Sequence, residues 1–358
     1  MDTFHLYQDI QARTKGEIYI GVVGPVRTGK STFVRRFMEQ LVLPHMKKEN
    51  SQVSKDELPV SGGGKTITTV EPKFVPAKAA EVELDEGITA KIRLIDCVGF
   101  VIDGAFGLDE NNQVRMVKTP WLKEAIPFPQ AAEIGTGKVI RDHSTVGILV
   151  TTDGTIGDFP REAYKSAEEK TVLELKKTGK PFVIVLNSQK PYSQETKALA
   201  EELSKTYETA VIPVNCEQMK EEDIRRILTE LLYAFPLTRI EFFVPRWIVE
   251  HPVKKAILES IREIFANVGS LRDVTAESLA PSCEYIDKSK LEQISLSDGS
   301  VQVRLEVPEK YYYQMLSEMA GVQIDGEYQL ISMIRELSEK RREYESVQEA
   351  LNAVHGTG

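Results

Sequence analysis

Gly24-Pro25-Val26-Arg27-Thr28-Gly29-Lys30-Ser31 is the stretch that decides the fold of this 358-residue chain. It fits the pattern G-x-x-x-x-G-K-[ST], the phosphate-binding loop of nucleotide triphosphatases. The apolar, β-branched segment 17–23 before it predicts a buried strand, and apolar residues at helical spacing in 32–42 predict a helix after it. Strand, glycine-rich loop and helix are the arrangement that such a loop requires. The sequence therefore predicts a nucleotide triphosphate site, and an ordinary glycine turn is the less favoured interpretation.

The residue types of this loop each have a chemical reason. Gly24 and Gly29 let backbone N–H groups turn toward the phosphates, and the helix N-terminus adds the positive end of its dipole. Lys30 would contact the β- and γ-phosphates, and the hydroxyl of Ser31 would ligate Mg²⁺. The predicted nucleotide-binding residues of the loop are Gly24, Arg27, Thr28, Gly29, Lys30, Ser31 and Thr32.

The composition describes an ordinary soluble globular protein, with 41% hydrophobic and 28% charged residues. The net charge of -9 argues against a nucleic-acid-binding surface spread over the whole molecule. Three widely spaced cysteines, Cys97, Cys216 and Cys283, suggest neither a disulfide framework nor a zinc site, and a reducing, cytoplasmic setting fits best. No segment approaches the roughly 20 apolar residues that span a bilayer, and no signal peptide is expected. Membrane contact would then be peripheral or through a partner.

A polar segment with three consecutive glycines, 47–65, follows the first predicted helix and leads into Thr66, Thr68 and Thr69. Small GTPases keep their first switch at this place in the chain, where a threonine hydroxyl completes the Mg²⁺ shell. The other interpretation is that these threonines begin a strand, since threonine favours strands. The order of the loop relative to Lys30 favours the switch.

Two alternating strands, 80–84 and 90–96, are joined by a turn-forming Asp-Glu-Gly. Asp96 at the end of the second strand suits the positioning of Mg²⁺, and Gly99 would offer its N–H to the γ-phosphate. GTPases with the pattern Asp-x-x-Gly often carry a glutamine just after that glycine, whereas this chain has Phe100. Because an apolar side chain cannot polarise water, hydrolysis is expected to be slow or to use another group.

The remaining strands and helices of the first domain follow in an α/β pattern after a Gly/Pro-rich insertion at 100–130. The segment 151–158 after one strand is either a turn or a ligand loop, and the sequence leaves both open. The predicted strands lie at 146–150, 181–186 and 210–214, and the predicted helices at 131–143, 160–178 and 220–234.

The segment Asn187-Ser188-Gln189-Lys190 occupies the place where GTPases carry Asn-Lys-x-Asp. The aspartate of that pattern accepts two hydrogen bonds from guanine, and the cationic Lys190 cannot accept them. The scaffold is therefore GTPase-like without its guanine reader. Asn187 is kept among the predicted nucleotide-binding residues.

The pattern changes at residue 237, which predicts a nucleotide-binding domain over 1–236 and a smaller α+β domain over 237–358. The second domain is expected to hold a strand at 239–244, a helix at 252–267, a β-pair around 283–306 and a charged helix at 329–354. That last helix has an apolar stripe, and it is either an amphipathic surface helix or an interaction helix.

With these residues in place, the sequence closely resembles the stage IV sporulation protein A family of endospore-forming bacteria, along essentially its whole length. The resemblance rests on GPVRTGKST at 24–32, GKTITTVEPKFVP at 64–76, RLIDCVG at 93–99, AAEIGTGKVIRDHST at 131–145, TTDGTIGD at 151–158 and GKPFVIVLNS at 179–188.

The resemblance implies an α/β P-loop NTPase domain of GTPase-like (TRAFAC) type with a mainly parallel sheet, followed by a smaller α+β middle domain. It implies an ATPase with ATP and Mg²⁺ as cofactors, catalytic residues Lys30, Asp96, Thr68 and Thr69, and metal contacts from Ser31, Thr69 and Asp96.

The family polymerises on the developing forespore and forms the base layer of the spore coat. The resemblance therefore implies self-assembly in the mother-cell cytoplasm, at the forespore outer membrane. It also implies contacts with a small membrane-associated sporulation peptide and other coat proteins through a further C-terminal region beyond residue 358. No nucleic-acid partner and no transmembrane segment are expected.

Two other functions compete with a nucleotide-driven structural protein. The first is a GTPase switch, for example in ribosome assembly, which Lys190 and the acidic charge disfavour. The second is a small-molecule kinase, which would need an acceptor pocket and a base, and only the insertion at 100–130 offers room for them.

Overall fold

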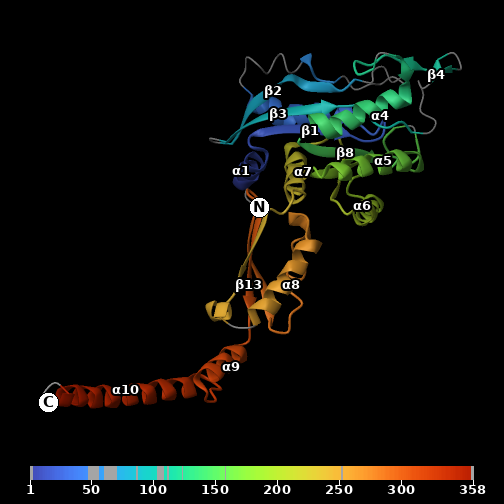
Figure 1. Cartoon of the computed structure of the whole chain (residues 1–358). Coiled ribbons are helices and arrows are strands. Elements are labelled where there is room, and N and C mark those ends of the chain that lie inside the picture. The colour runs from blue at the N-terminus through green and yellow to red at the C-terminus, as the bar shows by residue number, and fades with distance from the viewer. Residues whose placement is uncertain are drawn as a thin grey trace. The chain divides into compact units, whose positions relative to one another are not determined.

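The computed structural model describes residues 3–46, 56–59, 71–85, 88–102, 109–110, 113–122, 124–157, 159–250 and 253–355. It divides the chain into two compact units (Figure 1). The first unit comprises Met1–Arg239, Ser270–Arg272 and Ser295–Ser300, and the second comprises Ile240–Gly269, Asp273–Ile294 and Val301–Gly358.

A six-stranded sheet in the order β10-β9-β8-β1-β3-β2 forms the centre of the first unit. Its strands are β1 (Glu17–Val23), β2 (Lys73–Asp85), β3 (Ile88–Asp96), β8 (Val146–Thr152), β9 (Phe182–Asn187) and β10 (Val211–Val214). Strands β10, β9, β8, β1 and β3 run parallel, and only the edge strand β2 is antiparallel, paired with β3. The predicted mainly parallel α/β sheet is confirmed.

Helices cover this sheet (Figure 1), and most were expected from the sequence. They are α1 (Thr3–Thr14), α2 (Lys30–Phe37), α4 (Phe128–Lys138), α5 (Glu162–Thr178), α6 (Gln194–Tyr207) and α7 (Glu221–Tyr233). Helix α6 is absent from the sequence-based prediction, although its start has a clear signal. Ser193 stands before the first turn, and its hydroxyl accepts a hydrogen bond from the N–H of Thr196 at 3.2 Å.

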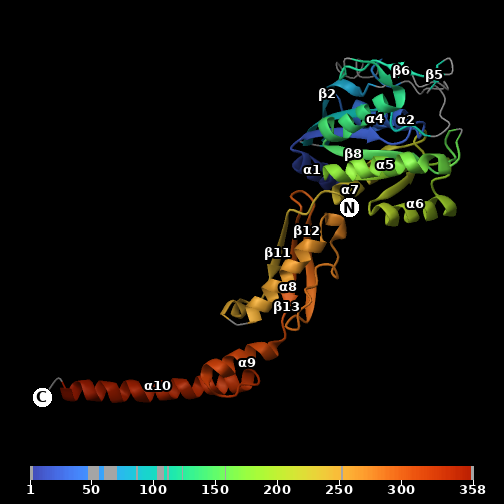
Figure 2. The same cartoon turned by 45° about the vertical axis from the view of Figure 1, so that its right-hand side comes forward.

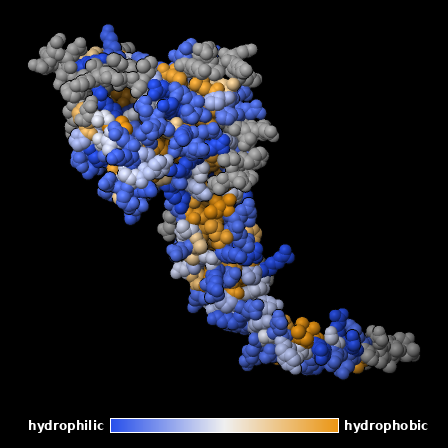
Figure 3. Space-filling view, turned by 180° about the vertical axis from the view of Figure 1, so that it is seen from behind, coloured by the Kyte–Doolittle hydropathy of each residue, from blue (hydrophilic) through white to orange (hydrophobic). Residues whose placement is uncertain are grey.

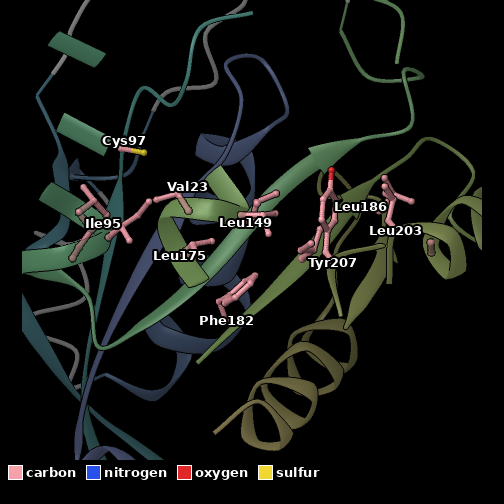
Figure 4. Close-up of a cluster of buried hydrophobic side chains, with 14 residues drawn as sticks. Val23, Ile95, Cys97, Leu149, Leu175, Phe182, Leu186, Leu203 and Tyr207 are labelled. Atoms are coloured by element: carbon pink, nitrogen blue, oxygen red, sulfur yellow. The ribbon is translucent and has the colours of Figure 1, made fainter. Parts of the chain in front are cut away.

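A continuous apolar cluster packs α5 and α6 against the strands (Figure 4). Leu149 and Leu186 from β8 and β9 are fully buried, and Leu175 of α5 and Leu203 of α6 join them. Every residue of β8 and β9 is buried, as expected for central parallel strands covered on both faces. This cluster fixes the carboxyl ends of the strands, from which the functional loops emerge.

A buried ion pair lies under the same strands. The guanidinium of Arg161 donates to both carboxylate oxygens of Glu168, at 2.6 and 2.7 Å, and Glu168 has no exposed surface. Tyr207 donates to the same carboxylate at 2.8 Å, and Thr151 donates to it as well. These donors compensate the carboxylate for the lost water, which an isolated buried charge could not tolerate.

The insertion at 100–130 contains two short β-ladders among its described residues. Strands β4 (Asp109–Glu110) and β5 (Gln113–Val114) pair with each other, as do β6 (Met116–Val117) and β7 (Ile126–Pro127). Phe128, which opens α4, is fully buried with Ala131 and Ala132. The insertion is thereby anchored to the first unit at its C-terminal end.

The second unit contains a three-stranded sheet in the order β11-β13-β12, with helix α8 running beside it (Figure 2). The elements are β11 (Arg239–Phe243), α8 (Val253–Asn267), β12 (Lys288–Ser295), β13 (Ser300–Glu306), α9 (Glu309–Ala320) and α10 (Glu327–His355). A short 3₁₀ helix, Arg246–Glu250, precedes α8. The expected strand, helix, β-pair and C-terminal helix are all present.

The apolar stripe of α10 faces solvent. Ile331, Ile334 and Leu337 are 54–57% exposed, and Tyr344 is 66% exposed. Figure 3 shows hydrophobic side chains on the surface of this helical part of the chain. A surface helix that packs its apolar face on its own unit would bury this stripe, so the observed exposure favours the interaction helix.

Among the described residues, no helix combines the length and apolarity needed to cross a membrane.

Candidate nucleotide-binding site

The loop after β1 bends through three residues with positive φ. They are Gly24 at +134°, Arg27 at +63° and Gly29 at +93°, and Gly29 is the residue that caps α2. Glycine adopts these angles without strain, whereas Arg27 is a non-glycine residue in the left-handed region. The loop is further fixed from outside, because the N–H of Val26 donates to the carbonyl of Phe100 at 2.9 Å.

Close backbone approach explains why Gly24 and Gly99 must be glycine. A Cβ on Gly24 would lie 2.3 Å from the carbonyl oxygen of Val150, and a Cβ on Gly99 would lie 2.0 Å from the carbonyl oxygen of Gly24. The same Cβ on Gly99 would lie 2.7 Å from Nζ of Lys30. The loop after β1 and the loop after β3 are therefore in van der Waals contact, which brings Gly99 to the phosphate-binding loop.

Lys30 and Asp96 are both buried, at 5% and 8% exposure. The ammonium of Lys30 donates to the carbonyl of Pro25 at 2.5 Å, inside its own loop. Burial lowers the pKa of Lys30, and the charge of Asp96 opposes that shift. Burial raises the pKa of Asp96, and the Ser31 hydrogen bond and the Lys30 charge oppose it. Both charges thus lie in a poorly solvated site, where each interacts strongly with any charged group that enters.

Ser31 and Asp96 form a pair that fits a magnesium ion. Oγ of Ser31 donates to Oδ2 of Asp96 at 2.6 Å. Oδ1 of Asp96 is buried and accepts no hydrogen bond of good geometry from the described residues. A hydroxyl and a carboxylate with an unused oxygen are the hard donors that Mg²⁺ prefers, and Mg²⁺ commonly takes its other ligands from phosphate and water. The described residues contain no cluster of three His, Cys, Asp or Glu side chains suited to a metal.

Asn187 connects the phosphate-binding loop to the end of β10. Its Nδ2 donates to the carbonyl of Thr28 at 3.0 Å, and its Oδ1 accepts from the N–H of Cys216 at 3.0 Å. A Cβ on Gly29 would lie 2.4 Å from the same Nδ2. The Asn187 side chain is 3% exposed, so both bonds are shielded from water. The side chain of Asn187 therefore positions the phosphate-binding loop by bonding to the backbone of that loop.

The other predicted loop residues surround the same place. The side chain of Thr28 is fully buried and donates to the carbonyl of Pro25 at 3.0 Å. Arg27 and Thr32 are half-buried. Thr68 and Thr69 lie outside the described residues. The structure thus brings together three parts of the sequence that are far apart: Lys30 with Ser31, Asp96 with Gly99, and Asn187.

Phe100 belongs to an apolar cluster that includes Val26 of the phosphate-binding loop. Its side chain is 6% exposed and packs with Val26, Ile102 and Tyr164, while its carbonyl holds the phosphate-binding loop. The sequence comparison with GTPases noted only that this side chain cannot polarise water. Residue types did not predict that the Phe100 carbonyl supports the phosphate-binding loop, because a hydrogen bond between two backbone groups does not depend on the side chain. The same holds for the Pro25 carbonyl, which accepts from both Thr28 and Lys30.

The loops after β8 and β9 are tied to each other. Asp153 accepts at Oδ1 from the N–H of Thr155 at 2.9 Å and at Oδ2 from the hydroxyl of Thr196 at 3.2 Å. The hydroxyl of Thr155 accepts from the N–H of Gln189 at 2.9 Å. These bonds fix the conformation of residues 153–155, and a Cβ on Gly157 would lie 3.4 Å from the carbonyl oxygen of Arg27 in the phosphate-binding loop.

Lys190 lines a cavity of 630 Å³ between the segments that follow β9 and β10, together with Tyr192, Asn215 and Gln218. No residue of the phosphate-binding loop contributes to this cavity. The position that reads guanine in GTPases therefore carries a cation, and the cavity lining also includes the charged residues Lys220, Glu222, Asp223 and Arg226.

Comparisons with known proteins agree over the whole chain. Residues 1–236 match the family model described as stage IV sporulation protein A, ATPase domain, and residues 237–358 match the model of the middle domain of the same protein. The chain is 43% identical over 353 residues to the stage IV sporulation protein A of Clostridioides difficile (strain 630), covering 97% of this chain and 72% of the relative. It is also 43% identical over 364 residues to the proteins of that name from Bacillus anthracis and Bacillus subtilis (strain 168), covering 100% of this chain and 74% of each relative.

Replacing Asn187 by alanine should weaken nucleotide binding, because its side chain holds the phosphate-binding loop. The carbonyl of Thr28 and the N–H of Cys216 would each lose a buried partner, at a cost of about 1–3 kcal/mol each. We expect the dissociation constant for Mg-ATP, measured by isothermal titration calorimetry, to rise about tenfold or more.

Gln11→Ala is the matched control. The side-chain amide of Gln11 donates to the carbonyl of Thr89 at 2.7 Å, and neither residue belongs to the phosphate-binding loop or to the cavity beside Lys190. Its affinity for Mg-ATP should stay within about twofold of that of the parent protein, because the phosphate-binding loop keeps its contacts. Equal affinity of the Asn187 variant and the parent would contradict the positioning role.

Proposed function

The chain belongs to the stage IV sporulation protein A family and carries its ATPase domain, and from this premise we propose that it binds Mg-ATP, hydrolyses it slowly and polymerises on the forespore surface as the base layer of the spore coat. The arrangement of Ser31, Asp96 and Lys30 at the end of β1 and β3 is the observation that carries the nucleotide part. The sporulation setting rests on the family.

The described residues support specific roles in this reaction. Lys30 would leave the Pro25 carbonyl for the β- and γ-phosphate oxygens, a contact between opposite charges that its buried position strengthens. Ser31 and Asp96 would hold Mg²⁺, which supplies neutralisation of the phosphate charge during transfer. Gly99 has no side chain between its N–H and the phosphates. Together these groups orient the triphosphate of a P-loop NTPase of GTPase-like type.

Slow turnover follows from what stands beside Gly99. Phe100 is buried among apolar side chains, and nothing in its side chain can orient or deprotonate water. We infer a rate well below the roughly 10 per second of typical metabolic enzymes. Hydrolysis at such a rate suits a protein that changes state once and then persists in an assembly.

Assembly would couple the loop that carries Thr68 and Thr69 to subunit contacts. By the family resemblance these threonines sense the γ-phosphate, and its loss would release the loop. The exposed apolar stripe of α10 is a surface that subunit contacts would cover. Head-to-tail contacts whose rotation does not close give open filaments. The proposed place is the mother-cell cytoplasm, with the small membrane-associated sporulation peptide and other coat proteins as partners.

A GTPase switch is the second candidate, because Asp96, Gly99 and Asn187 sit around the phosphate-binding loop as in that class. Lys190 opposes it, since an ammonium cannot accept hydrogen bonds from the guanine N1–H and amine. The identity of the base therefore separates the two functions.

ATP should bind more tightly than GTP. We expect the thermal midpoint of the first unit to rise with Mg-ATP more than with equal concentrations of Mg-GTP, because stabilisation grows with the ratio of ligand concentration to dissociation constant. Differential scanning fluorimetry over a concentration series measures both. Stabilisation by GTP equal to or above that by ATP would support the GTPase switch instead.

Lys30→Ala should abolish ATP binding, whereas Asp96→Asn should retain binding and lose turnover. The alanine removes the cation that holds the phosphates, while the amide weakens a metal contact that matters most in the transition state. We expect hydrolysis by the Asp96 variant to fall about 100-fold or more, measured by phosphate release.

The variant Lys180→Ala is the control for the loss of a lysine that makes several hydrogen bonds. Its Nζ donates to the carbonyls of Ile140, Arg141 and Ser144, remote from the phosphate-binding loop. That variant should keep its affinity for ATP even if it melts earlier. Full turnover by Asp96→Asn would remove Asp96 from the proposed mechanism.

Polymer should form chiefly with ATP. We expect sedimentation to pellet the protein after incubation with Mg-ATP and much less with a non-hydrolysable analogue or without nucleotide, because the hydrolysed state is the one that assembles. The protein should be tested together with the C-terminal region implied by the family, and Lys30→Ala serves as the control. Equal pelleting in all conditions would show that the nucleotide does not control assembly.

A further inference from the structure

A second cavity, of 520 Å³, lies wholly within the second unit, away from every residue of the nucleotide site. It is bounded by the end of β11, the 3₁₀ helix that follows it, the end of β13, the first turns of α9 and the start of α10. Its volume falls in the range of about 300–1,000 Å³ that is usual for small-molecule sites. None of the functions proposed above uses it.

Aromatic rings form much of its wall. Phe243, Trp247, Tyr312 and Tyr313 all line the cavity. The rings of Trp247 and Tyr312 are 5.7 Å apart between centroids, tilted by 52°, and those of Tyr312 and Tyr313 are 5.4 Å apart. Phe243 is 41% exposed, and the other three rings are half-buried. Such partly open rings in different planes offer π faces to a ligand that enters between them.

Three carboxylates share the same cavity. Glu306 ends β13, Glu309 opens α9, and Glu327 opens α10. The single cation in the lining is Arg304, and its Nε donates to Glu292 on β12 at 2.5 Å. The hydrogen bond and charge of Glu292 and then the charge of Glu306 raise the pKa of Arg304, so the guanidinium offsets part of the negative charge near Glu306. The lining therefore carries three carboxylates and one guanidinium beside its aromatic wall, and Glu309 and Glu327 supply its excess negative charge.

Helix dipoles do not account for this arrangement. An acidic residue in the first turn stabilises a helix, which explains the residue type of Glu309 and of Glu327 separately. It does not explain why both helices start at one cavity, or why Glu306 on a strand joins them. Partial desolvation and then the charges of Glu327 and Glu309 raise the pKa of Tyr313, which lines the same cavity. Like charges so gathered repel each other, and a cation between them removes the repulsion.

We propose that this cavity binds an aliphatic polyamine, a small cation with two or three ammonium groups on an alkyl chain. The ammonium groups pair with Glu306, Glu309 and Glu327. The alkyl chain packs on Trp247, Tyr312 and Tyr313, and the ammonium groups next to it also contact these rings. Ammonium groups are attracted both by carboxylates and by the faces of aromatic rings. Several separated carboxylates match a ligand with several charges better than one with a single charge.

Trp247 offers a direct readout. The chain has two tryptophans, Trp121 and Trp247, so Trp121→Phe leaves only the one in the cavity wall. We expect spermidine to change the fluorescence of this variant in a saturable way at 150 mM salt, where weak surface attraction is screened. The reciprocal variant Trp247→Phe, which keeps Trp121 in the first unit, should show no change.

Variants then separate charge from aromatic surface. In the Trp121→Phe background, Glu309→Gln with Glu327→Gln should raise the dissociation constant for spermidine about tenfold, from the loss of two partly exposed ion pairs. Tyr312→Leu should weaken binding by a similar factor, and Tyr312→Phe should restore it. Glu339→Gln on the exposed part of α10 is the control and should stay within about twofold, because it lies outside the cavity. Circular dichroism shows whether each variant keeps its helices.

Three results would overturn the assignment. One is the absence of a saturable signal from Trp247 at millimolar spermidine. Another is equal binding by the parent and the double glutamine variant, which would show attraction to the acidic chain as a whole. The third is a lysine-containing peptide, acetylated at its N-terminus and amidated at its C-terminus, that binds more tightly than spermidine and depends on Tyr312 in the same way. That result would make the cavity a docking site for a protein segment. Retained Mg-ATP binding in all variants keeps this test independent of the nucleotide site.

Discussion

Backbone contact at the end of β1 is the constraint on which the nucleotide site depends. The carbonyl of Gly24 leaves no room for a Cβ on Gly99, and the carbonyl of Val150 leaves none for a Cβ on Gly24. The loops after β1 and β3 and the strand β8 therefore meet at distances that only glycine permits. Because these three strands are parallel, their carboxyl ends lie at the same edge of the sheet, and the buried cluster between α5 and the strands holds that edge in place.

Charge is concentrated where the backbone is tightest. Lys30 and Asp96 are both buried, and burial disfavours the charged form of each, so the pKa of the lysine falls and that of the aspartate rises. In the protein alone the two charges partly offset each other, Lys30 donates to the Pro25 carbonyl, and Asp96 accepts from the Ser31 hydroxyl. A triphosphate with its magnesium ion supplies the missing partners. The buried charges that are unfavourable in the empty site are therefore the same charges that bind the triphosphate and its magnesium ion.

The two units divide the chemistry between them. The first holds the phosphate-binding loop and the residues that position it, and the second exposes aromatic and apolar surface without a nucleotide motif. Exposed apolar side chains on α10 and the aromatic cavity beside α9 are features that a unit serving only as a spacer would not need. Their chemistry suits contacts with other molecules.

The sequence by itself determined the strand, loop and helix around Lys30, because the glycine spacing and the flanking apolar residues reflect local geometry. It also determined the parallel sheet, since buried strands alternating with helices have few other solutions. Helix α6 escaped notice although Ser193 marks its start. Only the tertiary structure decided that Asn187 bonds the Thr28 carbonyl, that Phe100 supports the loop through its backbone, and that Glu306, Glu309 and Glu327 share one cavity. These contacts join segments distant in the chain or use backbone atoms, and neither leaves a pattern in the order of side chains.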